Sequence, residues 1–174
     1  MFEDYLVDCN YFFIEGQKIV DEREAKKFFR ASVFYAASSI EAFAFYIADT
    51  FNKGNSFSQI ETAFLLDKKI ILDIDKVEVK EVNEFHRLED KLKIFIKKFV
   101  KDFDFQCKEW SHFMEFKKFR DRLIHPKETD DEISIKDYKK NIKNGLSSII
   151  FLMNSISKGV FRKPLRKKLL DLIP

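Results

Sequence analysis

Residues 31–48 read ASVFYAASSIEAFAFYIA and contain a single charged residue, Glu41. Such a segment must be shielded from water either by a lipid bilayer or by the rest of the protein. A membrane-spanning helix needs about 20 consecutive apolar residues, and here three serines and a carboxylate interrupt a shorter run. We therefore predict a helix from about residue 21 to residue 51, buried in a protein core and not in a membrane.

The composition favours an all-α fold. The 174-residue chain has 21 phenylalanines but only four glycines and three prolines, which suits long helices better than a turn-rich β-sandwich. No repeat, low-complexity tract or linker divides it, so we predict one domain spanning residues 1–174. Apolar periodicity and capping signals predict a series of helices that ends with a short one within 161–174, and a small hairpin or irregular excursion near 68–80. The expected longer helices are 2–15, 21–51, 56–66, 88–99, 110–124 and 134–159. Ser56 with Gln59 and Ser134 with Asp137 have the spacing of capping boxes at the start of the third and sixth helices. Gly54 is expected to close the second helix and Gly159 the sixth, and Gly16 to end or bend the first.

The charge and cysteine content exclude several classes. A net charge of +3 is too small to indicate nucleic-acid binding by itself. Cys9, Cys107 and three scattered histidines match no metal-binding spacing, so we predict no metal site and no cofactor. The N-terminal MFEDYLVDCN carries acids where a secretory signal carries bases, which predicts a reduced, cytoplasmic protein.

Two charges occupy positions that should face the interior. On the predicted 110–124 helix, Arg120 falls within an apolar arc, whereas Arg122 points to the opposite side. The arc is formed by Phe113, Phe116, Leu123 and Ile124. Glu41 poses the same problem with the opposite sign, so we predict that Glu41 and Arg120 meet where their helices pack. The pair is either a buried ion pair that fixes helix register or the floor of a polar cleft in which Glu41 holds Arg120.

His125 precedes Pro126, which places it at the C-terminal end of the same helix. Asp121 lies four residues earlier, within reach of the imidazole if the last turn stays helical. A carboxylate bonded to one ring nitrogen fixes the tautomer and leaves the other nitrogen for proton transfer. Alternatively, His125 only caps the helix and Asp121 only pairs with Lys117.

The segment FRDRLIHPK, residues 119–127, resembles the signature of the HEPN superfamily. In that signature an Arg is usually followed by a polar residue and then by a His, with four to six residues between the Arg and the His. Four residues separate Arg120 from His125, and Asp121 takes the polar position that Asn often fills. The resemblance extends over roughly residues 22–157. It implies a four- or five-helix bundle that commonly dimerises through the motif-bearing helix. Many members are metal-independent ribonucleases, including toxins of toxin–antitoxin and phage-defence systems, and others bind without cutting.

On this resemblance we expect a homodimer whose shared cleft contains Arg120 and His125 from both chains. Arg120 would stabilise phosphate charge, His125 would act as base or acid, and Asp121 would orient His125. The partners expected are RNA and, besides a second copy, an antitoxin or a nucleotidyltransferase-like protein. The alternatives are a non-catalytic HEPN module that dimerises and binds nucleotide, RNA or protein, and a purely structural helical bundle.

Further basic residues are candidates for binding substrate. Arg122 lies within the motif and Lys127 follows it, and we expect both to contact flanking phosphates. Arg162 and Lys163 belong to a basic run near the C-terminus that either follows an RNA backbone or is a solvated tail. The run comprises Lys158, Arg162, Lys163, Arg166, Lys167 and Lys168. The lysine-rich face of the 88–99 helix carries the same ambiguity.

Overall fold

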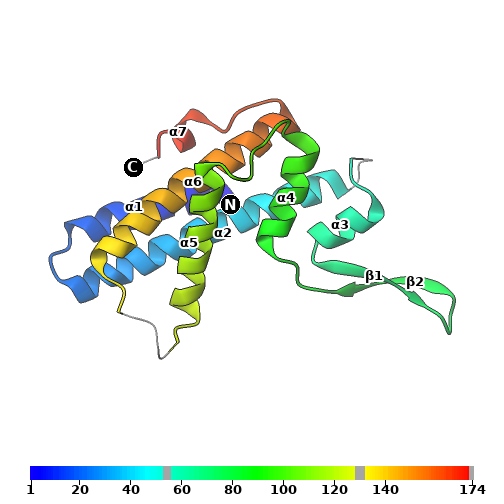
Figure 1. The fold of residues 1–174 in the computed structure, drawn as a ribbon, viewed down its shortest axis with the longest axis horizontal. Helices are drawn as coiled ribbons and strands as arrows, with labels where there is room; N and C mark the ends of the chain where they lie inside the picture. Colours follow the sequence, from blue (N-terminus) through cyan, green and yellow to red (C-terminus); the bar gives the residue numbers. More distant parts are fainter. Residues whose placement is uncertain (53–55, 128–131, 173–174) are drawn as a thin grey trace.

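The computed structural model describes residues 1–52, 56–127 and 132–172, which form seven helices and one two-stranded sheet (Figure 1). Five helices have 12 residues or more, in agreement with the predicted all-α architecture. In chain order the elements are α1 (Phe2–Lys18), α2 (Glu22–Asn52), α3 (Gln59–Leu65), β1 (Lys68–Asp73), β2 (Glu78–Asn83), α4 (Leu88–Phe99), α5 (Lys108–Ile124), α6 (Ile135–Phe161) and α7 (Lys167–Leu170).

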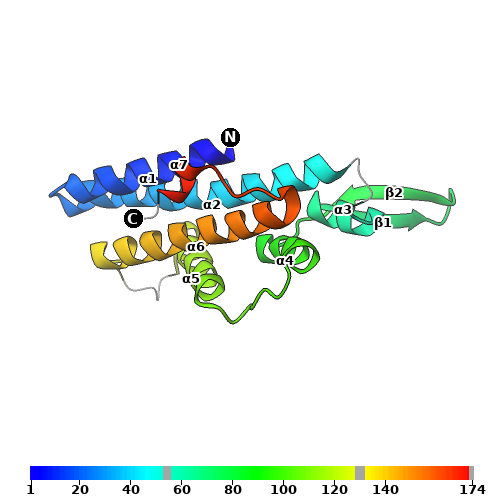
Figure 2. The same ribbon diagram turned by 90° about the horizontal axis from the view of Figure 1, so that it is seen from above.

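The helix α2 is the central core element. By length and composition it could cross a membrane, but 56% of its most apolar 18-residue window is buried within the protein. It packs in an antiparallel hairpin with α1 and also contacts α5 and α6. In the view of Figure 2, α6 lies between α1 on one side and α4 and α5 on the other. Neighbouring helices thus cover more than half of the apolar segment found in the sequence.

Two glycines that the sequence suggested as helix ends lie inside helices. α1 continues through Gly16 to Lys18, and α6 continues through Gly159 to Phe161. A Cβ on Gly16 would lie 2.9 Å from the Phe29 ring, and one on Gly159 would lie 2.4 Å from the Phe99 carbonyl oxygen. These glycines allow close packing between elements, which a sequence pattern cannot distinguish from helix termination. Gly54, expected to close α2, lies outside the described residues.

The helices α5 and α6 pack closely around a third glycine. Trp110, Phe113, Phe116 and Phe119 form the buried face of α5. Gly145 of α6 lies directly against Phe116, since a Cβ there would come 2.2 Å from the ring. The predicted capping box of Ser134 and Asp137 is confirmed at the start of α6. Together these contacts fix the orientation of α5, the helix that carries the Arg–His motif.

The excursion near 68–80 is an antiparallel hairpin that projects from one end of the bundle (Figures 1 and 2). Its strands pair in a register that places Ile70 opposite Glu81 and Leu72 opposite Val79. The preceding helix begins later than expected: Ser58 and Glu61 form the capping box, not Ser56 and Gln59. Both pairs have the required spacing, and only the geometry of the chain after residue 55 decides between them.

The basic C-terminal segment folds back onto the bundle. Leu165 and Leu169 are buried in the core, and the Ser157 hydroxyl donates to the Lys163 carbonyl at 2.9 Å. The Arg166 and Lys168 side chains lie 3.2 Å and 3.3 Å from the carboxylate of one acid in α1, Glu3. The described part of this segment is therefore a packed element whose charge is partly neutralised.

Candidate functional site

A cavity of about 660 Å³ lies between α2, the start of α4 and the C-terminal half of α5. Among the described residues its walls carry six basic side chains and two acidic ones beside an apolar surface. The charged lining residues are Arg87, Lys117, Lys118, Arg120, Arg122, Lys127, Glu41 and Asp121; His125 also lines the cavity, and the apolar ones are Ala37, Ile40, Phe85, Leu88, Phe113 and Phe116. This combination suits an anionic ligand that also has an apolar part.

The predicted meeting of Glu41 and Arg120 is confirmed at the wall of this cavity. Arg120 Nη2 lies 3.8 Å from Glu41 Oε1, and Nη1 donates to Asp121 Oδ1 at 3.1 Å. The Arg120 side chain is 31% exposed and that of Glu41 51%. The guanidinium is thus held between two carboxylates but remains reachable from solvent. This pair is not the dry, buried ion pair that the sequence left open as one alternative.

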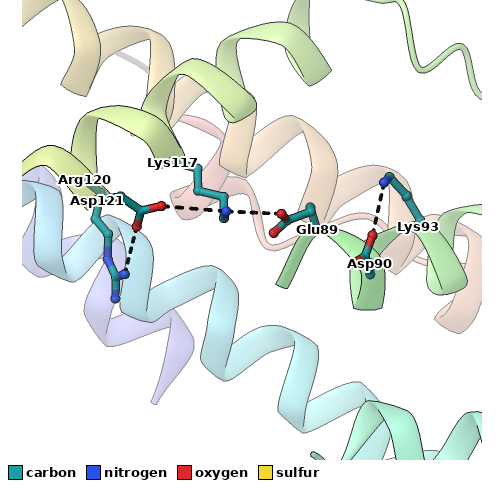
Figure 3. A network of polar contacts seen from close by, with 6 residues as sticks. All are labelled: Glu89, Asp90, Lys93, Lys117, Arg120 and Asp121. Carbon is teal, nitrogen blue, oxygen red and sulfur yellow. Dashed lines mark hydrogen bonds and ion pairs between the residues drawn. The ribbon is translucent and has the colours of Figure 1, made fainter. Parts of the chain in front are cut away.

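A chain of ion pairs extends from this guanidinium to α4 (Figure 3). Asp121 Oδ2 lies 3.7 Å from Lys117 Nζ, which in turn lies 3.1 Å from Oε1 of Glu89. Glu89 is buried, and its second carboxylate oxygen has no hydrogen-bond partner among the described residues. The Nε of Arg120 is likewise buried without such a partner. The network links α5 to α4 and leaves unused hydrogen-bonding capacity near the cavity.

His125 lies at the mouth of the cavity, as the C-cap residue of α5. Its backbone N–H donates to the Asp121 carbonyl at 2.9 Å, while its side chain is exposed. The expected contact between the Asp121 carboxylate and the imidazole is not formed. His125 has left helical geometry, with φ −124° and ψ 65°, and the carboxylate is taken by two full cations, Arg120 and Lys117. Within the described residues no hydrogen bond engages the ring.

The structure brings together six of the eight predicted site residues: Glu41, Arg120, Asp121, Arg122, His125 and Lys127 all line the cavity. Arg122 was expected on the opposite side of α5. It lines this cavity and also a neighbouring one beside Tyr138, because both cavities lie at the C-terminal end of α5, where Lys127 lines both as well.

Arg162 and Lys163 lie elsewhere. Arg162 caps the C-terminal end of α6 and lines a separate basic hollow with Lys98, Lys101 and Lys158. That hollow lies beside the end of α4, whereas the motif lies at the end of α5. These two residues therefore do not share the cavity of Arg120.

Several residues of the cavity wall were not assigned to a site from the sequence, among them Phe85, Arg87, Leu88 and Lys118. Lys118 lies on α5 next to the motif and could have been found from its position. Phe85 and Arg87 precede α4, and nothing in the sequence places them near residue 120. Their proximity depends on how α4 and α5 each pack on α2 and α6.

Comparisons with protein-family models, with curated proteins and with solved structures found no match. Over the described parts of the chain, no group of three or more His, Cys, Asp and Glu side chains is placed to hold a metal ion.

Proposed function

We propose that this protein is a metal-independent endoribonuclease, a toxin or defence effector, that cleaves RNA with Arg120 and His125. The observation that carries the proposal is that a partly exposed arginine and an unengaged histidine share one basic cavity. The resemblance of residues 119–127 to the HEPN signature adds support. The acids beside Arg120 keep its guanidinium fixed, and a fixed guanidinium suits phosphate oxygens.

The proposed reaction needs no water in its first step. The 2′-hydroxyl of the RNA attacks the adjacent phosphorus, and its proton passes to a base. A new P–O2′ bond forms while the P–O5′ bond breaks, and the departing 5′-oxygen takes a proton from an acid. The products are a 2′,3′-cyclic phosphate and a 5′-hydroxyl end. Arg120 stabilises the charge that develops on the phosphorane oxygens, and His125 transfers one of the two protons.

A second copy of the chain would supply the other histidine. An isologous contact repeats every residue across its two-fold axis, so a homodimer formed over the cavity contributes two arginines and two histidines. Phe34 and Phe45 support such a contact. They are exposed on α2 and lie two turns before and one turn after Glu41, on the same side of the helix. Exposed aromatic side chains that flank a site are common at protein interfaces.

The test is cleavage of a labelled single-stranded RNA in excess EDTA. His125→Ala should lower the rate by about 10²- to 10⁴-fold, the usual contribution of one acid–base group. Arg120→Ala should lower it by about 10²- to 10³-fold, as expected for the loss of one group that stabilises transition-state charge. His112→Ala is the matched control, because His112 lies on α5 but lines a different cavity.

Substituting a 2′-deoxynucleotide at the cleaved position should abolish cutting there, because the attacking hydroxyl is gone. Wild-type rates in both His125→Ala and Arg120→Ala would remove these residues from the reaction, and loss of activity in EDTA would contradict a metal-independent mechanism. A sedimentation experiment on Phe45→Glu tests the dimer: the variant should be monomeric at concentrations where the native chain is dimeric.

One observation favours a second function, a non-catalytic module that binds nucleotide, RNA or protein. Both terminal nitrogens of Arg120 already face carboxylates, those of Glu41 and Asp121, so a phosphate must compete with them. A binding module predicts RNA affinity without turnover and a tolerated His125→Ala substitution. The assay above separates the two functions.

A further inference from the structure

Phe85 is unusual among the apolar cavity residues because it is 85% exposed, whereas the others are buried or half-buried. It belongs to the segment 84–87, which connects β2 to α4, and it lines the cavity beside Arg87 and Leu88. A large aromatic side chain left in water contributes little to the stability of the fold. Its position in the wall of a basic cavity leaves the ring accessible to a ligand bound there.

The segment that carries Phe85 is fixed by Asp67. The carbonyl oxygen of Asp67 accepts the Glu84 N–H at 2.9 Å, and its carboxylate accepts the His86 N–H at 2.9 Å. The other carboxylate oxygen accepts from Lys91 Nζ at 2.6 Å, and Lys91 is itself buried. The residues on both sides of Phe85 are therefore bonded to one anchor.

The same two neighbours turn Phe85 outward. The His86 ring stacks on Phe64, with 3.9 Å between the ring centroids. Exposure alternates along this segment, with Glu84 and His86 half-buried and Phe85 and Arg87 exposed, as expected where successive side chains point to opposite faces. The aromatic face is thus presented to the cavity by a fixed backbone and not by a free loop.

Aromatic side chains and cations together form the usual site for single-stranded nucleic acid. A basic groove follows the phosphates, and each exposed ring supplies a face on which a base can stack. Both parts are present here, since Phe85 shares the cavity with Arg87 and Arg120. In a duplex the bases are stacked on each other and no base face is free, so such a ring selects unpaired nucleotides.

We propose that Phe85 is a stacking platform that selects single-stranded RNA, and that it holds a nucleobase next to the phosphate bound by Arg120. This proposal rests on the proposed function, because it names the class of substrate for the same cavity. It also assigns a binding role to a residue outside the Arg–His motif.

Binding of a 2′-deoxy-substituted, uncleavable oligonucleotide, followed by fluorescence anisotropy, tests the proposal. Phe85→Ala and Phe85→Leu should each weaken binding by about 5- to 150-fold, the effect of losing one base–aromatic stack. Phe85→Tyr should bind like the native protein, because it keeps the ring. Tyr11→Ala is the matched control, since Tyr11 is a 55%-exposed aromatic on α1 that does not line the cavity.

Two further measurements make the test specific. A 2-aminopurine base in the oligonucleotide should lose fluorescence on binding to the native protein, but much less on binding to Phe85→Leu, because stacking quenches this base. A fully paired duplex of the same sequence should bind at least tenfold more weakly than the single strand. Thermal unfolding of each variant should match the native protein, because Phe85 is exposed.

Equal affinity of Phe85→Ala and native protein, equal binding of duplex and single strand, or no binding of the single strand would each overturn the proposal. These outcomes are separate from the ribonuclease test. Phe85-dependent binding without any cleavage would reject the nuclease and leave the platform standing. Cleavage that requires His125 but is unaffected by Phe85→Ala would do the reverse.

Discussion

Asp121→Asn is the substitution that most directly tests whether the cavity binds an anion at Arg120. The change keeps the size of the side chain and removes one negative charge next to Arg120, whose Nη1 lies 3.1 Å from Asp121 Oδ1. Glu41 would still contact Arg120, and Lys117 would still pair with Glu89. The guanidinium should therefore keep its position while one competitor of the phosphate is removed.

The expected magnitude follows from the geometry. A phosphate bound to Arg120 would lie about 6 Å from the Asp121 carboxylate, and two unit charges at that separation repel by about 1 kcal/mol in a half-exposed, largely aqueous setting. Removing this repulsion should tighten binding of an uncleavable single-stranded RNA by about fivefold. The gain should shrink as salt rises from about 0.05 M to 0.5 M, because the Debye length falls below the charge separation.

Asp90→Asn is a closely matched control for this experiment. Asp90 has the same exposed fraction as Asp121, 44%, and its carboxylate also lies 3.1 Å from a cation, Lys93 (Figure 3). It does not line the cavity. Affinity should be unchanged in Asp90→Asn. If Asp121→Asn binds with the same affinity as this control, the phosphate does not bind at Arg120. Weaker binding than the control would mean that Asp121 chiefly positions the guanidinium.

Two further predictions concern the core. Gly145→Ala should destabilise the fold by about 2 kcal/mol and lower Tm by about 4–8 °C, because overpacking against Phe116 outweighs the better helix propensity of Ala. Thermal unfolding followed by circular dichroism measures this, and adding Phe116→Leu to the Gly145→Ala variant should recover part of the loss. An unchanged Tm would contradict the close contact. Burial raises the pKa of the Cys9 thiol to about 12, so at pH 8 a thiol reagent should label Cys107 in the folded protein and Cys9 only in denaturant. The stabilising effect of the neutral Cys9 thiol should be complete below its ordinary pKa of 9.0 and decline as the pH rises from there toward 12, since only the unfolded chain ionises readily; labelling of Cys9 in the native state would contradict its burial.

Local signals in the sequence were sufficient for most of the helices. The 88–99 helix, the capping box at Ser134 and the contact between Glu41 and Arg120 follow from periodicity and from the cost of burying charge. The predicted helix end at Gly159 and the capping box at Ser56 and Gln59 were wrong, and of the two alternatives for Gly16 the helix end is excluded. Packing requires Gly16 and Gly159 to lack a side chain.

Some features of the candidate site likewise followed from the sequence, and others only from the tertiary structure. The sequence by itself placed Arg120 inward, His125 at a proline-stopped helix end and Glu41 near them, because these positions depend on helix geometry within one or two elements. Only the tertiary structure showed that the Asp121 carboxylate contacts Arg120 and not His125, that Arg162 lines another hollow, and that Phe85 lines the cavity. Those relations depend on how α4 and α5 each pack on α2 and α6 and on the anchor at Asp67, and contacts between residues distant in sequence leave no periodic signal in the chain.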